Sequence, residues 1–400
     1  MTEPPTLGST PDEVARVSTA LDRFLERHPD PSTADRVVFL RDQYESGLAW
    51  VHFDAGHGGL GVPASLQRLV ASRLEALGAP APGCGDYVGM HQVASALNAS
   101  ATPAQRDRFL PGIFTGTEIW CQLFSEPGAG SDLAGLSTMA VRDGDEWVVT
   151  GQKVWTSQGH LARWGILLAR SDPGAVKHRG LTFFVCDMTL PGVMVRPLRQ
   201  ADGSAHFSVV FLDDVRLPDD LRISEPGQGW GVAVTALHSE REGIGDALET
   251  PWEHVERAWR DYEAPTPTLG AVMRDRVAAA WIDTKLIELL RRRLAAGQGR
   301  AGSTPLGSLL KLVQGATNQR CASLLVDLLG PAGQVGFDYD APESAPQMLV
   351  VRSRANTIEG GSDEIQRNII GERVLGLPGD ARVDKAIPWR DVPRSATAAR

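Results

Sequence analysis

Long apolar runs are missing from this 400-residue sequence, and no stretch approaches the roughly 18–20 consecutive apolar residues that a bilayer span requires. The first residues, MTEPPTLGST, have neither the basic start nor the apolar core of a secretory signal. Cysteine is scarce, and its four residues lack CxxC spacing, which argues against a disulfide framework or a thiolate zinc site. We therefore expect a cytoplasmic protein in a reducing environment, with no membrane partner.

Positive charge is also in deficit. The chain has 40 basic and 49 acidic residues, a net charge of −9, and such a chain is a poor partner for a phosphate backbone. The nine histidines show no HExxH or other metal-ligand spacing, so we predict no metal site. Apolar residues make up 42% and charged residues 22%, which indicates a globular chain long enough for two or three packed units.

Hydrophobic periodicity divides the chain into three blocks. Residues 11–27 and 66–77 repeat apolar side chains at helical spacing, and the second of these segments stops at Gly78 and Pro80. From residue 119 the pattern becomes β-prone, and the Asp143-Gly144 pair between two such runs indicates a hairpin. Further strands are expected at residues 165–169, 181–187, 193–197 and 207–212. Long helical patterns return at residues 231–248, 271–294, 306–329 and 363–375.

These blocks predict an α+β, mainly α chain of three domains: N-terminal helices over 1–118, a middle antiparallel β domain over 119–223, and a C-terminal helical bundle over 224–400. No helix-length segment separates the central strands, so a doubly wound parallel sheet is disfavoured.

Two segments in the middle block have the composition of a site for a planar ligand. The first, IWCQLFSEPGAGSDLAGL at residues 119–136, contains Gly128 and Gly130, which let a backbone approach a ligand closely. The second, GQKVWTSQG at residues 151–159, adds an aromatic surface at Trp155 and a hydroxyl at Ser157. On the residues alone, an ordinary turn beside a core tryptophan remains the simpler interpretation.

These two segments closely resemble the flavin-binding signatures of the acyl-CoA dehydrogenase family. The run TIEGGSDEIQRNIIGERVLGLP at residues 357–378 resembles that family's last helix, and the order of helical, β and helical blocks matches its three-domain fold. The resemblance implies an FAD enzyme that converts an acyl-CoA thioester to its α,β-unsaturated form. A glutamate removes the α-proton and the β-hydride passes to flavin N5.

The resemblance allows two positions for this glutamate. One lies on the first helix of the C-terminal domain, as in the isovaleryl-CoA and long-chain relatives, with a signature similar to Leu237-His238-Ser239-Glu240-Arg241. Glu240 shares its helix face with small apolar residues such as Ala233 and Ala236, where burial would raise its pKa toward neutrality. We predict Glu240 as the base.

The other position precedes the last helix. Counting back from Ile365-Gln366-Arg367 puts Gly360 where that glutamate belongs, and Glu359 falls one residue too early. Glu359 is therefore the second choice for the base. The backbone N–H of Gly360 is expected to help hold the thioester carbonyl.

The remaining site residues are carried over from the resemblance. It places Ser131, Arg241 and Gly360 at the acyl-CoA. It assigns the flavin to Phe124, Ser125, Gly130, Ser131, Trp155, Ser157, Ser362 and Glu364. Ser362 also fits the N-cap of the final helix, and capping alone is an equally weighted interpretation.

One departure from the family concerns the cross-subunit part of the cofactor site. The family's Arg-x-x-Phe-Gly segment has no counterpart in residues 258–276, and its Gly-Gly-x-Gly stretch reads Gly330-Pro331-Ala332-Gly333 here. The resemblance implies a dimer or tetramer that passes electrons to an electron-transfer flavoprotein, and the departure leaves a paralogous partner subunit open. Two alternatives follow: a flavin oxidase or monooxygenase on the same fold, or a catalytically silent subunit that completes a partner's site.

Overall fold

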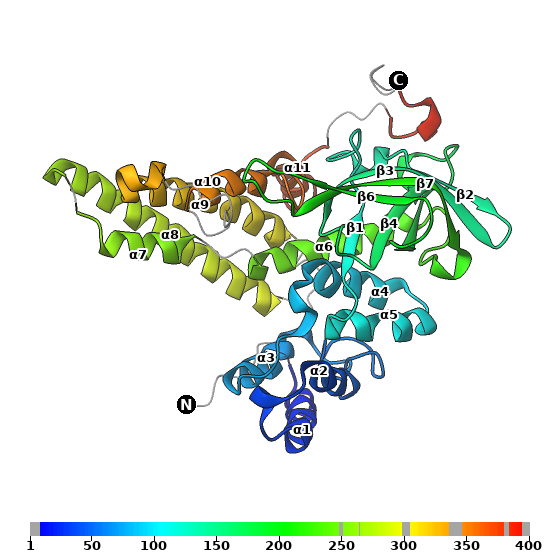
Figure 1. Ribbon diagram of the computed structural model, residues 1–400, viewed down its shortest axis with the longest axis horizontal. Coiled ribbons are helices and arrows are strands. Elements are labelled where there is room, and N and C mark those ends of the chain that lie inside the picture. The colour runs from blue at the N-terminus through cyan, green and yellow to red at the C-terminus, as the bar shows by residue number, and fades with distance from the viewer. Residues whose placement is uncertain are drawn as a thin grey trace. The chain divides into compact units, whose positions relative to one another are not determined.

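The computed structural model describes residues 9–247, 251–263, 265–297, 305–335, 346–379 and 384–393 (Figure 1). The side chains of residues 241–247, 295–297 and 305–306 lie outside this description. The chain forms two compact units. The sheet unit comprises residues up to 198, 207–240 and the C-terminal residues from 382, and the bundle unit comprises 199–206 and 241–381. Each is described by itself below, and the domain boundaries at 118 and 223 stay a prediction.

The sheet unit begins with a block of helices, the first of which supplies its own N-terminal cap. The first, α1 (Pro11–Arg27), starts with a reciprocal capping box between Thr10 and Glu13 and buries Val17, Leu21 and Phe24. Helix α3 (Gln67–Ala76) follows a short 3₁₀ turn, so the helices predicted at 11–27 and 66–77 are confirmed. The other helices of this block are α2 (Arg36–Glu45), α4 (Ala94–Ser100) and α5 (Pro103–Thr115).

A seven-stranded sheet follows, with the order β1-β4-β2-β3-β7-β6 and β5 paired to β4. Its strands are β1 (Trp120–Leu123), β2 (Met139–Asp143), β3 (Glu146–Ser157), β4 (Trp164–Arg170), β5 (Leu181–Asp187), β6 (Val193–Leu198) and β7 (Phe207–Pro218). All the strands expected from the sequence are present, and the β2–β3 hairpin turns at Asp143 and Glu146 as predicted.

The expected antiparallel sheet is confirmed for most strand pairs, but two pairings of β4 differ from it. Strand β4 pairs in parallel with β1 and, at one position, with β2. The whole β2–β3 hairpin lies between β1 and β4 in sequence, which is the long connection that parallel pairing needs. All seven residues of β4 are buried, so both faces of this strand are covered.

Helix α6 (Gly229–Ala247) begins in the sheet unit and is held there along its buried face. Ala233 and Ala236 are fully buried, as the predicted inward face requires. The Ser239 hydroxyl donates to the His91 carbonyl at 2.7 Å, and the Tyr87 hydroxyl donates to the Glu240 carbonyl at 2.7 Å. These two bonds fix the axial position of the turn that carries Glu240.

The bundle unit is helical, as predicted for the C-terminal block. It contains α7 (Trp252–Arg260), α8 (Pro267–Gly297), α9 (Pro305–Leu329), α10 (Pro346–Ser353) and α11 (Asp363–Ile369). Its core joins Val255 on α7, Met273 and Val277 on α8, and Cys321 and Leu325 on α9. The segment predicted as one helix over 363–375 changes at Ile370 to a π-helical stretch, Ile370–Val374. None of the described helices is both long and apolar enough to span a membrane.

The four cysteines are unpaired and differ in exposure. Cys121 and Cys186 lie in the core of the sheet, Cys321 lies in the core of the bundle unit, and Cys84 is exposed. Burial raises the pKa of the Cys186 thiol to about 12 and that of Cys321 to about 11. These three buried thiols behave as apolar packing groups.

Candidate functional site

The glycine-rich segment predicted to bind a ligand is the loop between β1 and β2, residues 124–137, called the glycine loop below. Its first part closes on itself, because Glu126 and Ala129 exchange two backbone hydrogen bonds of 3.0 Å. The next residues are open: a Cβ built at Gly128 or Gly130 would meet nothing within 4 Å. The loop therefore presents bare backbone that a flat ligand can approach.

A buried ion pair anchors this loop to the sheet. Lys153 on β3 is fully buried, and its Nζ donates to the Glu126 carboxylate at 2.9 Å, to the Phe124 carbonyl at 3.1 Å and to the Leu168 carbonyl at 2.8 Å. All three protons of the ammonium group are thereby used, two on the glycine loop and one on β4.

The Glu126 carboxylate is equally well satisfied. It accepts the Ser137 N–H at 2.7 Å, the Ser137 hydroxyl at 2.9 Å and the Thr138 N–H at 2.9 Å. Burial disfavours its charge, but the Lys153 ammonium and these hydrogen bonds outweigh that cost and lower the pKa of Glu126 to about 2. The pair thus closes the glycine loop at both ends, through Phe124 and through Ser137.

A bulge in β3 separates two side chains that a regular strand would place on the same face. The register of β3 against β7 shifts between Lys153 and Thr156, and Trp155 takes a left-handed backbone conformation with φ of 59°. Lys153 therefore points into the core, whereas Trp155 is 60% exposed, with its ring edge-on to Phe207 at 5.9 Å. An exposed tryptophan held in a strained conformation is typical of a ligand surface.

The sheet unit brings six of the predicted ligand residues onto the glycine loop and the end of β3. Gly130 and Ser131 are exposed, and Ser125 and Ser157 are half-buried. Ser125 connects the two segments, because its carbonyl accepts the Val154 N–H at 2.9 Å. Trp155 completes the exposed surface.

Phe124, also predicted to line the flavin, is placed differently. Its ring is 2% exposed and packs edge-on against Phe183 at 5.8 Å. Its ring packs into the core beneath the start of the glycine loop.

The predicted base lies at the end of the sheet unit's share of α6. Glu240 is half-buried, one turn beyond the fully buried Ala236. Its backbone is held by Tyr87, as described above. The side chain of Arg241, predicted to contact the substrate, lies outside the described residues.

The second choice for the base, Glu359, lies in the bundle unit and is fully engaged. One carboxylate oxygen accepts from Arg352 Nη2 at 3.0 Å and the other from Asn356 Nδ2 at 2.6 Å. Both carboxylate oxygens are therefore already engaged in hydrogen bonds within this segment. This arrangement argues against Glu359 as a proton acceptor.

The turn after Glu359 has the backbone that glycine favours. Gly360 and Gly361 have φ of 66° and 92°, and the Gly360 carbonyl accepts from the buried Gln366 side chain at 2.8 Å. Ser362 caps α11, with its hydroxyl accepting the Ile365 N–H at 3.4 Å, so the capping role is confirmed. The Glu364 side chain is 80% exposed.

Sequence reasoning missed the Lys153–Glu126 pair. The available signal was the period-2 pattern of β3, in which Lys153 continues the buried positions begun at Trp147 and Val149. A lysine on the buried face requires an anionic partner, which the structure shows to be Glu126 of the glycine loop.

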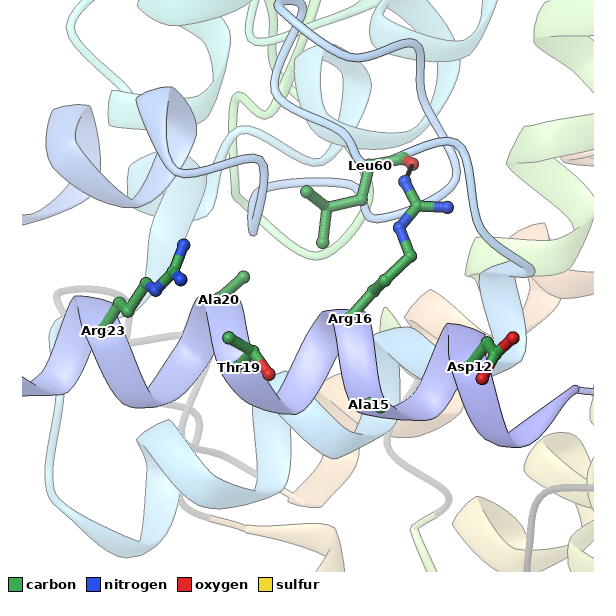
Figure 2. Close-up of a pocket in the computed structure, with 7 residues that line it drawn as sticks. All are labelled: Asp12, Ala15, Arg16, Thr19, Ala20, Arg23 and Leu60. Carbon is green, nitrogen blue, oxygen red and sulfur yellow. Dashed lines mark hydrogen bonds between the residues drawn. The ribbon is translucent and has the colours of Figure 1, made fainter.

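A separate hollow of about 520 Å³ lies along α1 (Figure 2). It is lined by Asp12, Ala15, Arg16, Thr19, Ala20, Arg23 and Leu60, and the Arg16 guanidinium donates to the Leu60 carbonyl at 2.6 Å. It shares no residue with the predicted site.

Comparison with known proteins agrees with this geometry. The family model described as the acyl-CoA dehydrogenase middle domain matches residues 121–215, and the model of the acyl-CoA dehydrogenase C-terminal domain matches residues 227–375. The chain is 40% identical over 343 residues to the acyl-CoA dehydrogenase IpdE1 of Mycobacterium tuberculosis, covering 84% of this chain and 86% of that protein.

Solved structures show the same fold. A steroid ACAD named Tcur3481-Tcur3483 matches with a TM-score of 0.70 and 25% identity, covering 93% of this chain and 99% of that one. The ChsE4-ChsE5 complex from Mycobacterium tuberculosis matches with a TM-score of 0.69 and 26% identity, over 93% and 99% of the two chains.

Proposed function

The chain belongs to the acyl-CoA dehydrogenase family of oxidoreductases, and from this premise we propose that it catalyses the FAD-dependent α,β-dehydrogenation of an acyl-CoA thioester. The observation that carries the proposal is the open glycine loop, fixed by the Lys153–Glu126 pair beside the outward-facing Trp155.

The residues of the glycine loop fit a flavin. Gly128 and Gly130 leave space for a flat ring system, and a Cβ at either position would reduce that space. Trp155, at the end of β3, adds an exposed aromatic face. The Ser125 and Ser157 hydroxyls are available as hydrogen-bonding groups. When bound, FAD would supply the acceptor for the β-hydride of the substrate. In the bundle unit, we assign Ser362 and Glu364 to the same cofactor.

Glu240 is the proposed base. It lies on α6 beyond the small, buried Ala233 and Ala236, and the Tyr87 and Ser239 hydrogen bonds fix this turn of the helix. A base carried on a fixed turn of helix needs less reorganisation to reach the α-proton. The engagement of Glu359 by Arg352 and Asn356 supports this choice.

Donors to the thioester carbonyl would stabilise the negative charge that develops as the α-proton leaves. We assign the backbone N–H of Gly360 to this role, and Ser131 and Arg241 to binding of the acyl-CoA. Ser131 is exposed at the end of the open part of the glycine loop, where a bound thioester can reach it.

The proposed assembly is a dimer or tetramer. Helix α8 carries an apolar stripe on the side away from the bundle core, where Val272, Ile282, Leu286 and Leu289 are each at least 50% exposed. Their spacing puts them on one helix face, and covering such a stripe favours association. Electrons would pass to an electron-transfer flavoprotein.

A paralogous partner subunit is the favoured second candidate. The altered Gly330-Pro331-Ala332-Gly333 stretch and the missing Arg-x-x-Phe-Gly segment motivate it, and both steroid ACAD and ChsE4-ChsE5 are named as pairs of proteins. Purification of the chain alone without bound yellow flavin, followed by flavin binding on addition of a paralogue, would support a mixed assembly.

The experiment compares E240Q and E359Q under anaerobic conditions with the control E225Q, since the Glu225 side chain is 79% exposed and pairs with Arg222. We expect E240Q to lose about 10²–10⁴-fold in flavin bleaching by acyl-CoA while keeping its flavin spectrum, and E359Q to keep turnover. Loss of activity in E359Q alone would overturn the base assignment. The thioester panel includes linear, branched and steroid acyl groups, and stoichiometric peroxide formation in air would indicate an oxidase instead.

A further inference from the structure

The C-terminal segment, residues 384–393, returns to the sheet unit and joins the loop between β4 and β5. The Trp389 N–H donates to the Ala175 carbonyl at 2.8 Å and the Arg390 N–H to the Pro173 carbonyl at 3.0 Å. A bridge between Val176 and Pro388 adds a third backbone contact. This segment, which begins at Asp384, is thus paired with that loop, 166 positions after the last strand ends at Pro218.

The Trp389 side chain contacts the second half of the glycine loop. Its side chain is 7% exposed, its Nε1–H donates to the Gly135 carbonyl at 3.1 Å, and its ring lies 4.2 Å from the Arg170 guanidinium carbon. A cation against the face of a buried indole is a favourable contact, so Trp389 both fills the space and supplies a donor.

Arg170 donates hydrogen bonds to the two carbonyls that flank the Gly135 carbonyl. This fully buried residue at the end of β4 donates to the Ala134 carbonyl at 2.7 Å and to the Leu136 carbonyl at 3.1 Å. Three consecutive carbonyls of the glycine loop are therefore held by two side chains stacked on each other.

Lys177 also links the glycine loop to the C-terminal segment. It donates to the Asp132 carboxylate at 2.6 Å and also pairs with Asp384 of the C-terminal segment, while its own carbonyl accepts from Arg170 at 3.2 Å. Of the five residues that follow Ser131, four are bound to Lys177, Arg170 or Trp389.

We propose that the C-terminal segment is a positioning element of the active site, with Trp389 fixing residues 132–136 so that Ser131 and the open glycines keep the backbone geometry that ligand binding needs. This inference rests on the proposed function, which places acyl-CoA and flavin at the glycine loop. Trp389 acts through the loop backbone and contacts neither ligand. Its loss should raise the KM for acyl-CoA and the Kd for FAD more than it lowers kcat, because the base lies elsewhere, on α6.

The test uses two point variants and two truncations of the full chain. W389A removes ring and donor, W389F keeps a ring against Arg170 but removes the donor, truncation after residue 379 removes the whole segment, and truncation after residue 393 leaves it complete. The readouts are the Kd for FAD, kcat and KM with acyl-CoA, and amide hydrogen exchange in residues 131–137, with residues 146–157 of β3 as the internal reference.

We expect W389A and the truncation after residue 379 to weaken FAD or acyl-CoA binding about tenfold or more, with faster exchange confined to residues 131–137. W389F should fall between W389A and the wild type, and truncation after residue 393 should match the wild type. The proposal would be overturned if residues 131–137 of W389A or of W389F exchanged their amide hydrogens at the wild-type rate. It would also be overturned if the two truncations had equal effects. A wild-type chain that oxidises no thioester would instead refute the proposed function, since the exchange measurement is independent of turnover.

Discussion

Replacement of Lys153 by Met would test how the glycine loop is held to the sheet. Methionine keeps an unbranched side chain of similar length but removes the ammonium group. The change deletes three hydrogen bonds and leaves the Glu126 carboxylate buried with no cation, while the carbonyls of Phe124 and Leu168 lose a buried donor. Glu126 keeps its bonds from Ser137 and Thr138, which limit the damage.

The expected cost follows from these contacts. Removing one partner of a buried ion pair costs about 3–5 kcal/mol, and each orphaned buried carbonyl adds about 1–3 kcal/mol before relaxation. Because protonation of Glu126 can relieve part of the penalty, we expect a net loss of about 3–5 kcal/mol in the free energy of unfolding. This is a large share of the stability of a typical domain.

The assay is urea unfolding of K153M, E126Q and the double variant, with the Kd for FAD measured on each. R216M is the matched control, since Arg216 on the adjacent β7 bridges the exposed Asp143 and Glu146 and should contribute about 1 kcal/mol or less. The double variant should be less destabilised than the sum of the two single variants. A loss below about 1 kcal/mol in K153M, or strict additivity, would refute the anchoring role.

Two further predictions concern the sheet unit. Burial raises the pKa of Asp86 to about 6, despite bonds from the Gly89 and Trp120 N–H groups. The contribution of Asp86 to stability should therefore fall by about 3 kcal/mol as pH rises from about 4 to about 6. In urea titrations, the difference between wild type and D86N should change by this amount over that range, and a difference that does not vary with pH would contradict the assignment. W155G should relieve the strain of the left-handed backbone at this position, so the apoprotein should be as stable as the wild type or up to about 1 kcal/mol more stable. The same variant should bind FAD more weakly in a fluorescence titration, because it loses the exposed indole. An unchanged affinity for FAD would show that Trp155 is not part of the site.

Local patterns were sufficient to predict most elements. The helix at 11–27 has its capping residues and apolar face in its own sequence, and the hairpin at 142–149 carries its Asp-Gly turn between β-prone runs. The glycines at 128 and 130 marked the segment at 119–136 as a possible ligand loop, but only its resemblance to the family's flavin-binding signature favoured a site over an ordinary turn. In each case the decisive residues lie within one element or its turn.

Features that depend on distant residues could not be predicted in the same way. Parallel pairing of β1 with β4 depends on where the intervening hairpin is placed, and the outward orientation of Trp155 depends on a bulge against β7. The contact between Trp389 and Gly135 joins residues 254 positions apart. No local periodicity records such pairings, because their energy comes from surfaces that meet only in the folded chain.

The four cysteines of this chain allow the opening of its two hydrophobic cores to be measured by thiol reactivity. Cys84 is accessible to an alkylating reagent in the native state and calibrates the intrinsic rate, whereas Cys121 and Cys186 can react only when the sheet core opens, and Cys321 only when the bundle core does. Pulse alkylation read by peptide mass would therefore time the two cores separately in one unmodified sample. It would reveal whether the two cores open together or one before the other, without a probe engineered into the sequence.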